Sequence, residues 1–274
     1  MPQLLLLHGF MGAPSTWDRV VCALDGDFDV YRPWLGGHGP RDALWDACRD
    51  EPKVAEANQS ASDEARFSGY WSEVDRLAAH AHNAGFQQGL IAGYSLGARL
   101  ALGLCIRYPQ RFTHALFISG QPGLTSDHER ALRLSQDARW IELLQNAPLE
   151  SVVERWQAQP LFETQLGLPD ALLSEQRAVR LQHTRGGLAR SLRLTGLGAM
   201  PNLRPVLPTC PEGSSVVVGE LDQKFVTLGT ELAELLPNAN LHIVPGRGHN
   251  LPLESPESLA RLINEHVRAC TPRS

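Results

Sequence analysis

The stretch GYSLG at Gly93–Gly97 decides the fold of this chain. It matches the pattern G-x-S-x-G and lies between a short apolar run and a helix-forming segment. A sharp strand-to-helix turn leaves such a serine hydroxyl exposed at the edge of a sheet, and the flanking glycines prevent collisions. The helix that starts behind Ser95 favours negative charge developing beside it. The pattern therefore predicts a nucleophilic serine, and the alternative is an ordinary glycine-rich turn.

Two later segments supply an acid and a base in the order serine, acid, histidine that suits this turn. Asp222 follows the apolar run Ser215–Val218, and His249 follows the run Leu241–Val244 beside a glycine. We expect His249 to act as the general base for Ser95 and Asp222 to orient the imidazole ring. Glu220 is the rival carboxylate, although it lies nearer the strand end. The alternative for Asp222 is a helix N-cap.

The segment His8-Gly9-Phe10 follows the first apolar run. A turn at this place can direct a backbone N–H at a substrate carbonyl oxygen, so the N–H groups of Phe10 and Leu96 are the predicted oxyanion hole. We interpret the His8 side chain as a structural brace for the loop and His38 as a turn residue. The remaining histidines are interpreted as surface or packing residues: His80, His82, His114, His128, His183, His242 and His266.

Short apolar runs alternate with helical patterns, which indicates a mostly parallel sheet with helices on both faces. Together with the serine motif, this alternation predicts an α/β-hydrolase fold. The runs lack polar alternation, as is typical of strands buried on both sides. The expected strands are Gln3–Leu7, Phe28–Arg32, Gly89–Gly93, Ala115–Ser119, Ser215–Val218 and Leu241–Val244. One long helix is expected at Asp63–Ala84.

Residues 125–207 carry helical patterns without a convincing strand, which predicts a helical cap inserted between late strands. The core would then comprise residues 1–124 and 208–274. The expected cap helices are Asp127–Leu144, Leu149–Gln157, Asp170–His183 and Leu188–Leu194. Asp42–Ala61 is polar and poorly patterned, so we expect a surface loop there.

Composition narrows the class of protein. The chain has 274 residues, a net charge of −5 and 43% hydrophobic residues, consistent with one domain that buries a sizeable core and lacks a nucleic-acid-binding footprint. The run Leu4–Leu7 is too short to span a membrane, and no basic segment precedes a signal-like core. Five scattered cysteines without CxxC spacing favour a reduced, cytoplasmic protein. No metal or nucleotide motif is present, so we expect no metal and no cofactor.

The chain resembles the 2-succinyl-6-hydroxy-2,4-cyclohexadiene-1-carboxylate synthase family of menaquinone biosynthesis over most of its length. The segments that carry the resemblance are LHGFMG at 7–12, GYSLGAR at 93–99, GQPGL at 120–124, QPLF at 159–162, GELDQKF at 219–225 and GHN at 248–250. The resemblance implies a lyase that eliminates pyruvate from a succinylated cyclohexene dicarboxylate. In the implied mechanism Ser95, polarised by His249 and Asp222, removes a proton from a substrate carbon.

The resemblance also implies residues that bind the substrate. Arg99, Arg133 and Arg180 match family arginines that bind carboxylates, and Tyr94 and Trp156 match positions that line the site. Arg99 lies four residues after Ser95, which places it one helical turn away on the same face. The alternative is that these arginines are solvated, as cap arginines commonly are. The surface charges expected nearby are Arg130, Arg139, Arg177 and Arg185.

Two other functions remain open. A carboxylesterase or carbon–carbon bond hydrolase would use the same triad on a small, anionic substrate, because a fold does not determine a reaction. A non-catalytic binding module is disfavoured by the complete triad. The partner expected in the first two cases is a small anionic molecule, with neither nucleic acid nor membrane, and the protein would be a monomer or small homo-oligomer. The loop at 42–61 is longer than in the family, and the short N-terminal strands of the fold are expected to be missing or reduced.

Overall fold

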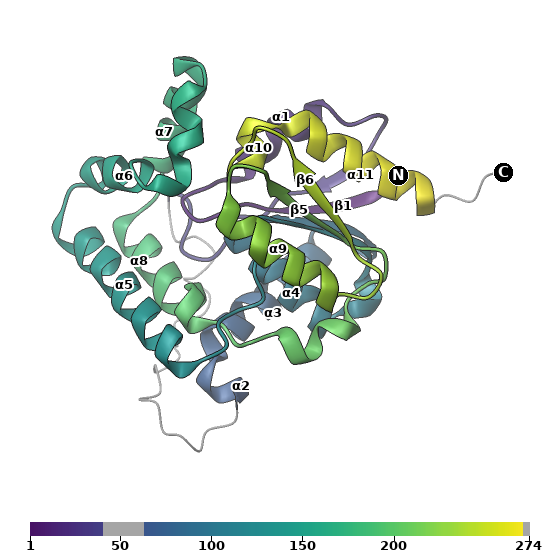
Figure 1. The fold of residues 1–274 in the computed structure, drawn as a ribbon, viewed down its shortest axis with the longest axis horizontal. Coiled ribbons are helices and arrows are strands. Elements are labelled where there is room, and N and C mark those ends of the chain that lie inside the picture. The colour runs from purple at the N-terminus through teal and green to yellow at the C-terminus, as the bar shows by residue number, and fades with distance from the viewer. Residues whose placement is uncertain (41–62, 271–274) are drawn as a thin grey trace.

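A single parallel sheet organises the molecule (Figure 1). The computed structural model describes residues 1–40 and 63–270. The sheet has six strands in the order β2-β1-β3-β4-β5-β6, and every neighbouring pair is parallel. All six predicted strands are confirmed, with differences only at their ends. The strands are β1 (Gln3–Leu7), β2 (Asp29–Tyr31), β3 (Gly89–Tyr94), β4 (Phe112–Ile118), β5 (Ser215–Gly219) and β6 (Asn240–Val244).

The strand order reverses between β1 and β3. From β1 the chain moves outward to β2 and then returns to pair β3 with the other side of β1. Loops at the carboxyl ends of strands diverge at such a switch point and leave a crevice, which is where open α/β sheets bind ligands. The loop after β1 carries Phe10, and the turn after β3 carries Ser95. The topology therefore brings the predicted oxyanion loop next to the predicted nucleophile.

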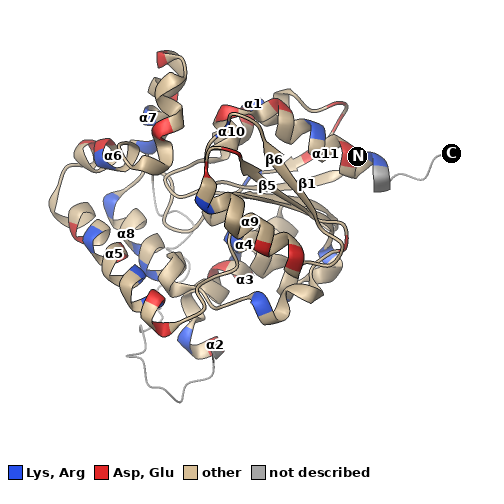
Figure 2. Cartoon of the chain, in the orientation of Figure 1, with Lys and Arg blue, Asp and Glu red and all other residues tan. Residues whose placement is uncertain are grey.

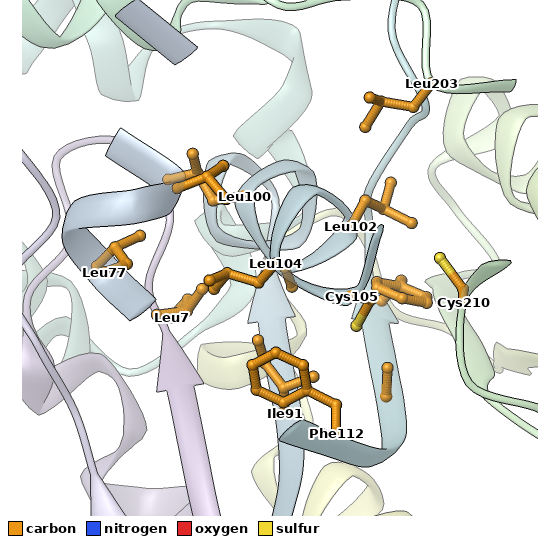
Figure 3. Packing of buried hydrophobic residues seen from close by; sticks show 14 of the residues in the cluster. Leu7, Leu77, Ile91, Leu100, Leu102, Leu104, Cys105, Phe112, Leu203 and Cys210 are labelled. Atoms are coloured by element: carbon orange, nitrogen blue, oxygen red, sulfur yellow. The ribbon is translucent and has the colours of Figure 1, made fainter. Parts of the chain in front are cut away.

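Helices cover the sheet on both faces, which explains why β1, β3 and β5 are apolar and buried almost throughout. In β1, Leu5 and Leu7 pack into one cluster and Leu4 and Leu6 into another, because successive side chains point to opposite faces. Figure 3 shows the first cluster, where Leu104 lies with Leu7. The helices that contribute to the first cluster are α3 (Ser68–Asn83), α4 (Leu96–Arg107) and α9 (Gln223–Leu235). The helices that contribute to the second cluster are α1 (Asp18–Cys22) and α11 (Pro256–Cys270).

The turn between β3 and α4 is too tight for side chains at its two glycines. A Cβ on Gly93 would lie 2.3 Å from the Gly97 oxygen, and one on Gly97 would lie 2.1 Å from the Leu7 oxygen. Ser95 between them has a φ of 53°, a left-handed conformation that serine adopts only under strain. The GYSLG stretch thus folds as the predicted strand–turn–helix, with the serine at the top of the turn.

The predicted helical cap lies between β4 and β5 and forms a separate group of helices beside the sheet (Figure 1). Ser126 and Glu129 form a capping box that starts its first helix. Leu144, Val152 and Leu188 from different cap helices pack around Met11 of the core. The cap helices are α5 (Asp127–Asn146), α6 (Leu149–Gln157), α7 (Asp170–Arg180) and α8 (Arg185–Thr195). The cap therefore has its own apolar centre and seats directly on the loop after β1.

Two expectations were wrong. The helix predicted over Asp63–Ala84 is divided at Phe67 into α2 (Asp63–Arg66) and α3, a break that the apolar periodicity does not record. Arg130 is a buried residue rather than a surface charge. Its guanidinium lies 4.6 Å from the centre of the Phe67 ring and donates to the carbonyl oxygens of Gly198 (3.0 Å) and Met200 (2.6 Å). Arg130 thus joins the cap to the core. The loop predicted at Asp42–Ala61 lies outside the described residues.

Candidate active site

Ser95, His249 and Asp222 form a continuous hydrogen-bonded chain. Nδ1 of His249 donates to Oδ2 of Asp222 at 2.7 Å, and the Ser95 hydroxyl lies 3.2 Å from Nε2 of the same ring. Because a carboxylate can only accept, Nδ1 carries the proton and Nε2 is left to accept from Ser95. The ring is 1% exposed. Such a chain can increase the basicity of the serine oxygen and store its proton on the imidazole.

Local structure holds the acid and the base in place. Asp222 uses its second oxygen, Oδ1, to accept from the Phe225 N–H at 3.3 Å at the start of α9. It is therefore both the helix N-cap and the partner of His249, so the two interpretations of the sequence hold together. Glu220, the rival carboxylate, instead accepts from the Gly246 N–H at 2.7 Å. The Ser119 hydroxyl donates to the His249 carbonyl oxygen at 2.9 Å.

Both residues of the predicted oxyanion hole, Phe10 and Leu96, line the cavity that contains Ser95. The Leu96 N–H lies in the first turn of α4, where helical N–H groups have no intrahelical partner. Within the described ranges the Phe10 N–H donates to no protein group. His8 is fully buried and accepts from the Leu35 N–H at 3.2 Å, which confirms it as a brace for this loop. Two backbone donors are thus available beside the serine.

The cavity above the triad has a volume of about 350 Å³ and reaches into the cap. Arg99, Arg133, Tyr94 and Trp156 all line it, as the family resemblance implied. Arg99 donates to the Thr195 carbonyl oxygen at 2.7 Å. Burial and then the charge of Arg133 lower the pKa of Arg99 to about 10, so it remains a cation at neutral pH. The cavity therefore places a partly buried positive charge one helical turn from Ser95.

Arg133 is held by an ion pair within α5. Its Nε donates to Oδ1 of Asp137 at 2.9 Å, one helical turn away. Asp137 is buried, and burial raises the pKa of its carboxyl group even though Arg133 and Arg99 oppose that change. Figure 2 shows that the cap helices carry several basic residues, all of which are arginines. Among the arginines of these helices, Arg133 is the one that lines the triad cavity.

Arg180 lies in a neighbouring cavity of about 390 Å³ that does not include Ser95 or His249. The two cavities share Phe10, Tyr94 and Phe162 as walls. The Arg180 guanidinium lies 5.3 Å from the centre of the Phe162 ring and is 4% exposed, and burial lowers its pKa to about 10. Its Nη1 has no hydrogen-bond partner among the described residues. The structure thus separates Arg180 from the other two arginines by a wall of aromatic side chains.

Several residues of the triad cavity had no assigned role in the sequence. Lys224 lines the cavity two residues after Asp222 and could have been suspected from that spacing. Others come from the cap, and only packing brings them to the serine. These residues are Gln159, Leu161, Phe162, Ser191, Leu192 and Thr195.

Within residues 1–40 and 63–270 there is no cluster of three or more His, Cys, Asp or Glu side chains that could hold a metal ion. In the same ranges, none of the helices combines the length and the apolar character needed to cross a membrane.

We expect the protein to lose stability as the pH falls from 6.5 toward 4. Burial is the largest cause that lowers the pKa of His8 from 6.5 to about 3 and of His183 to about 4. The unfolded chain therefore binds protons at these sites before the folded chain does, and the free energy of unfolding falls with pH. Each histidine contributes on the order of 1 kcal/mol per pH unit within that window. Calorimetric melting between pH 7 and 4 would measure this, and a melting temperature independent of pH down to 4.5 would contradict it.

Comparison with known proteins assigns the family. The family model described as "Alpha/beta hydrolase family" matches residues 4–262. The 2-succinyl-6-hydroxy-2,4-cyclohexadiene-1-carboxylate synthase of Enterobacter sp. (strain 638) is 30% identical, with 97% of this chain and 92% of that protein covered. The enzyme of the same name from Salmonella agona (strain SL483) is 29% identical, covering 96% and 94%.

A solved structure agrees with these relatives. "Structure of MenH from S. aureus" superposes with a TM-score of 0.83 at 25% identity, and covers 98% of this chain and 94% of that chain. The chain therefore belongs to the alpha/beta hydrolase family and, within it, to the family of 2-succinyl-6-hydroxy-2,4-cyclohexadiene-1-carboxylate synthases.

Proposed function

We propose that this enzyme is a lyase that eliminates pyruvate from a succinylated cyclohexene dicarboxylate and forms 2-succinyl-6-hydroxy-2,4-cyclohexadiene-1-carboxylate. One observation carries the proposal beyond family membership. Arg99 places a partly buried guanidinium in the same cavity as Ser95 and His249. Among the described residues Arg99 forms no ion pair with a carboxylate, and such a partly buried cation is suited to an anionic substrate, because the substrate carboxylate offsets the cost of removing the charge from water.

In the proposed reaction Ser95 acts as a base toward carbon. Its oxygen takes a proton from the substrate carbon next to a carbonyl group, while its own proton moves to Nε2 of His249. Asp222 stabilises the imidazolium that forms. The negative charge that develops on the carbonyl oxygen is stabilised by the N–H groups of Phe10 and Leu96. The anion then breaks the carbon–oxygen bond and expels the enolate of pyruvate, which takes up the proton held by His249 and becomes pyruvate. The triad is thereby restored, and no water is consumed.

The arginines are proposed to divide the substrate's carboxylates between the two cavities. Arg99 and Arg133 would bind the groups nearest to Ser95, since both line the triad cavity. Arg180 would bind a more distant carboxylate in the neighbouring cavity, where its Nη1 lacks a partner among the described residues. Tyr94 lies in the wall between the cavities, and Trp156 covers the triad cavity from the cap. A guanidinium fork suits each of these contacts, because it binds a carboxylate through two parallel hydrogen bonds.

The alternative is a serine hydrolase, either a carboxylesterase or a carbon–carbon bond hydrolase. The Ser95 hydroxyl at 3.2 Å from its base, with two backbone N–H groups nearby, would serve equally as a nucleophile toward a carbonyl carbon. The difference between the two functions lies in whether Ser95 attacks carbon or removes a proton from it.

A direct assay distinguishes the two functions. The succinylated cyclohexene dicarboxylate is generated in place by the preceding pathway enzyme, and pyruvate release is followed beside cleavage of p-nitrophenyl acetate. We expect fast pyruvate release with feeble ester cleavage. Ester cleavage without pyruvate release would reject the lyase and leave a hydrolase.

The division of the chain into a core and a cap is a further proposal. We propose that residues 125–207 act as the cap of a core formed by residues 1–124 and 208–274. Three expectations from the sequence stay predictions: a small anionic substrate, a cytoplasmic location, and a monomer or small homo-oligomer.

A further inference from the structure

Three histidines outside the triad form a buried cluster between the core and the cap. His8 follows β1, His38 lies in the loop after β2, and His183 follows the cap helix α7. The ring centres of His8 and His38 are 5.1 Å apart, and those of His38 and His183 are 5.3 Å apart. All three side chains are at most 4% exposed. None of them takes part in the proposed reaction, so their burial needs another explanation.

His38 is bonded to the oxyanion loop through a defined tautomer. Its Nε2 lies 3.1 Å from the Met11 nitrogen, and its Nδ1 lies 3.2 Å from the Gly36 carbonyl oxygen. A backbone N–H can only donate and a carbonyl can only accept, so Nδ1 carries the proton and Nε2 accepts. Burial lowers the pKa of His38 well below its ordinary value, which keeps Nε2 free to accept.

The residue that His38 holds is a strained one beside Phe10. Gly9–Gly12 forms a tight turn closed by the Gly12 N–H on the Gly9 carbonyl oxygen at 3.0 Å. Met11 in this turn has a φ of 57°, where a side chain other than glycine costs free energy. The peptide between Phe10 and Met11 could relieve that strain by rotating. A bond from the Met11 N–H to His38 opposes the rotation and thereby maintains the turn that presents the Phe10 N–H.

The cap is attached to the loop after β2, which carries His38. Nδ1 of His183 accepts from the Gly39 N–H at 2.9 Å, one residue after His38. A Cβ on Gly37 would lie 2.2 Å from the Gly187 oxygen of α8, so the backbones of loop and cap touch there. The ring of Phe10 also packs edge-on against His38, with centres 5.5 Å apart. The position of the cap is thus transmitted to the oxyanion loop through His38.

We propose that His38 is a positioning residue for the oxyanion hole, and that His183 connects the seating of the cap to it. The proposal rests on the proposed role of the Phe10 N–H in stabilising the developing oxyanion. It predicts that the loss of the Met11–His38 bond reduces turnover rather than substrate binding, because the oxyanion exists only along the reaction path.

Two amide variants of His38 separate this role from a merely structural one. In His38→Gln the amide lies near the place of Nε2 and can still accept from Met11, whereas in His38→Asn it lies near Nδ1 and can reach only Gly36. We expect His38→Asn to lower kcat by about 10- to 100-fold with KM changed less than about 3-fold, since misplaced catalytic groups cost this much. His38→Gln should recover most of that loss. His82→Leu, at an exposed position of α3, is the control and should leave kcat unchanged.

Equal kcat values for the two amide variants would overturn the proposal, and so would a loss confined to KM. Amide hydrogen exchange at Met11 provides a second measurement that does not need a variant of His38. We expect slow exchange in the wild type and faster exchange in His183→Leu, while fast exchange in the wild type would also overturn the proposal. If the wild type cleaves p-nitrophenyl acetate but releases no pyruvate, the proposed function fails alone, and the same variants are compared on the ester.

Discussion

Replacing Ser95 by alanine is expected to lower pyruvate release by about 10³- to 10⁶-fold, the range over which members of such triads act. The reason is that Ser95 carries the oxygen that removes the substrate proton, and His249 stands 3.2 Å behind it rather than at the substrate. The hydrogen bond between His249 and Asp222 would remain, but Nε2 of His249 would face a methyl group in place of the hydroxyl. Single-turnover measurement of pyruvate release at saturating enzyme would give the change in the chemical step.

Binding and folding should survive this substitution. Ser95→Ala removes one oxygen and leaves the arginines of both cavities in place, so the substrate should still quench the fluorescence of Trp156 in the cavity wall. Ser135→Ala, at an exposed position of α5, is the matched control and should be fully active. Pyruvate release within 10-fold of the wild type, with binding intact, would remove Ser95 from the proposed mechanism, because a loss that small lies outside the range for triad members.

Replacing Arg99 by methionine is expected to lower kcat/KM for the anionic substrate by about 10²- to 10³-fold, which corresponds to the 2–5 kcal/mol typical of a broken buried charge pair. Arg99 is partly buried and lines the cavity, where a carboxylate contact is weakened by solvent less than at the surface. Cleavage of p-nitrophenyl acetate, which has no carboxylate, should change little. The ratio of the two kcat/KM values therefore measures carboxylate binding separately from damage to the triad.

Arg139→Met serves as the control for Arg99, since it removes an arginine from an exposed position of the cap helix α5. Arg99 also donates to the Thr195 carbonyl oxygen, so the melting temperature of each variant must be compared with that of the wild type. Equal losses on the anionic substrate and on the neutral ester would argue against carboxylate binding by Arg99.

The two cavities suggest how the enzyme distinguishes a substrate with several carboxylates from one with a single carboxylate. Phe10, Tyr94 and Phe162 stand between Arg180 and the arginines of the triad cavity. A substrate with a single carboxylate could satisfy only one side of this aromatic wall. A substrate with several carboxylates, spaced across a ring and a side chain, could satisfy both. Selectivity would then come from spacing as well as from charge, since each unpaired buried cation carries an unfavourable free energy.

Local patterns in the sequence determined most of the framework of the site. The strands were predictable because a strand buried on both faces must be apolar throughout, whatever packs on it. The turn at Ser95 was predictable because its glycines have no room for a Cβ, which is a local requirement. The same reasoning located Asp222 and His249 after late strands. For Asp222 it also gave the helix N-cap as the alternative role. It did not predict that Asp222 is both the N-cap and the partner of His249.

Only the tertiary structure decided which cap residues meet the serine. Arg130 and Arg133 lie on the same helix three residues apart, yet one is buried against the carbonyl oxygens of Gly198 and Met200 and the other lines the cavity. Arg180 enters a separate cavity, and His183 joins His38 across the cap interface. An arginine or histidine can be solvated or buried at little cost in local conformation. Its place therefore depends on contacts between segments far apart in the chain, which no local pattern records.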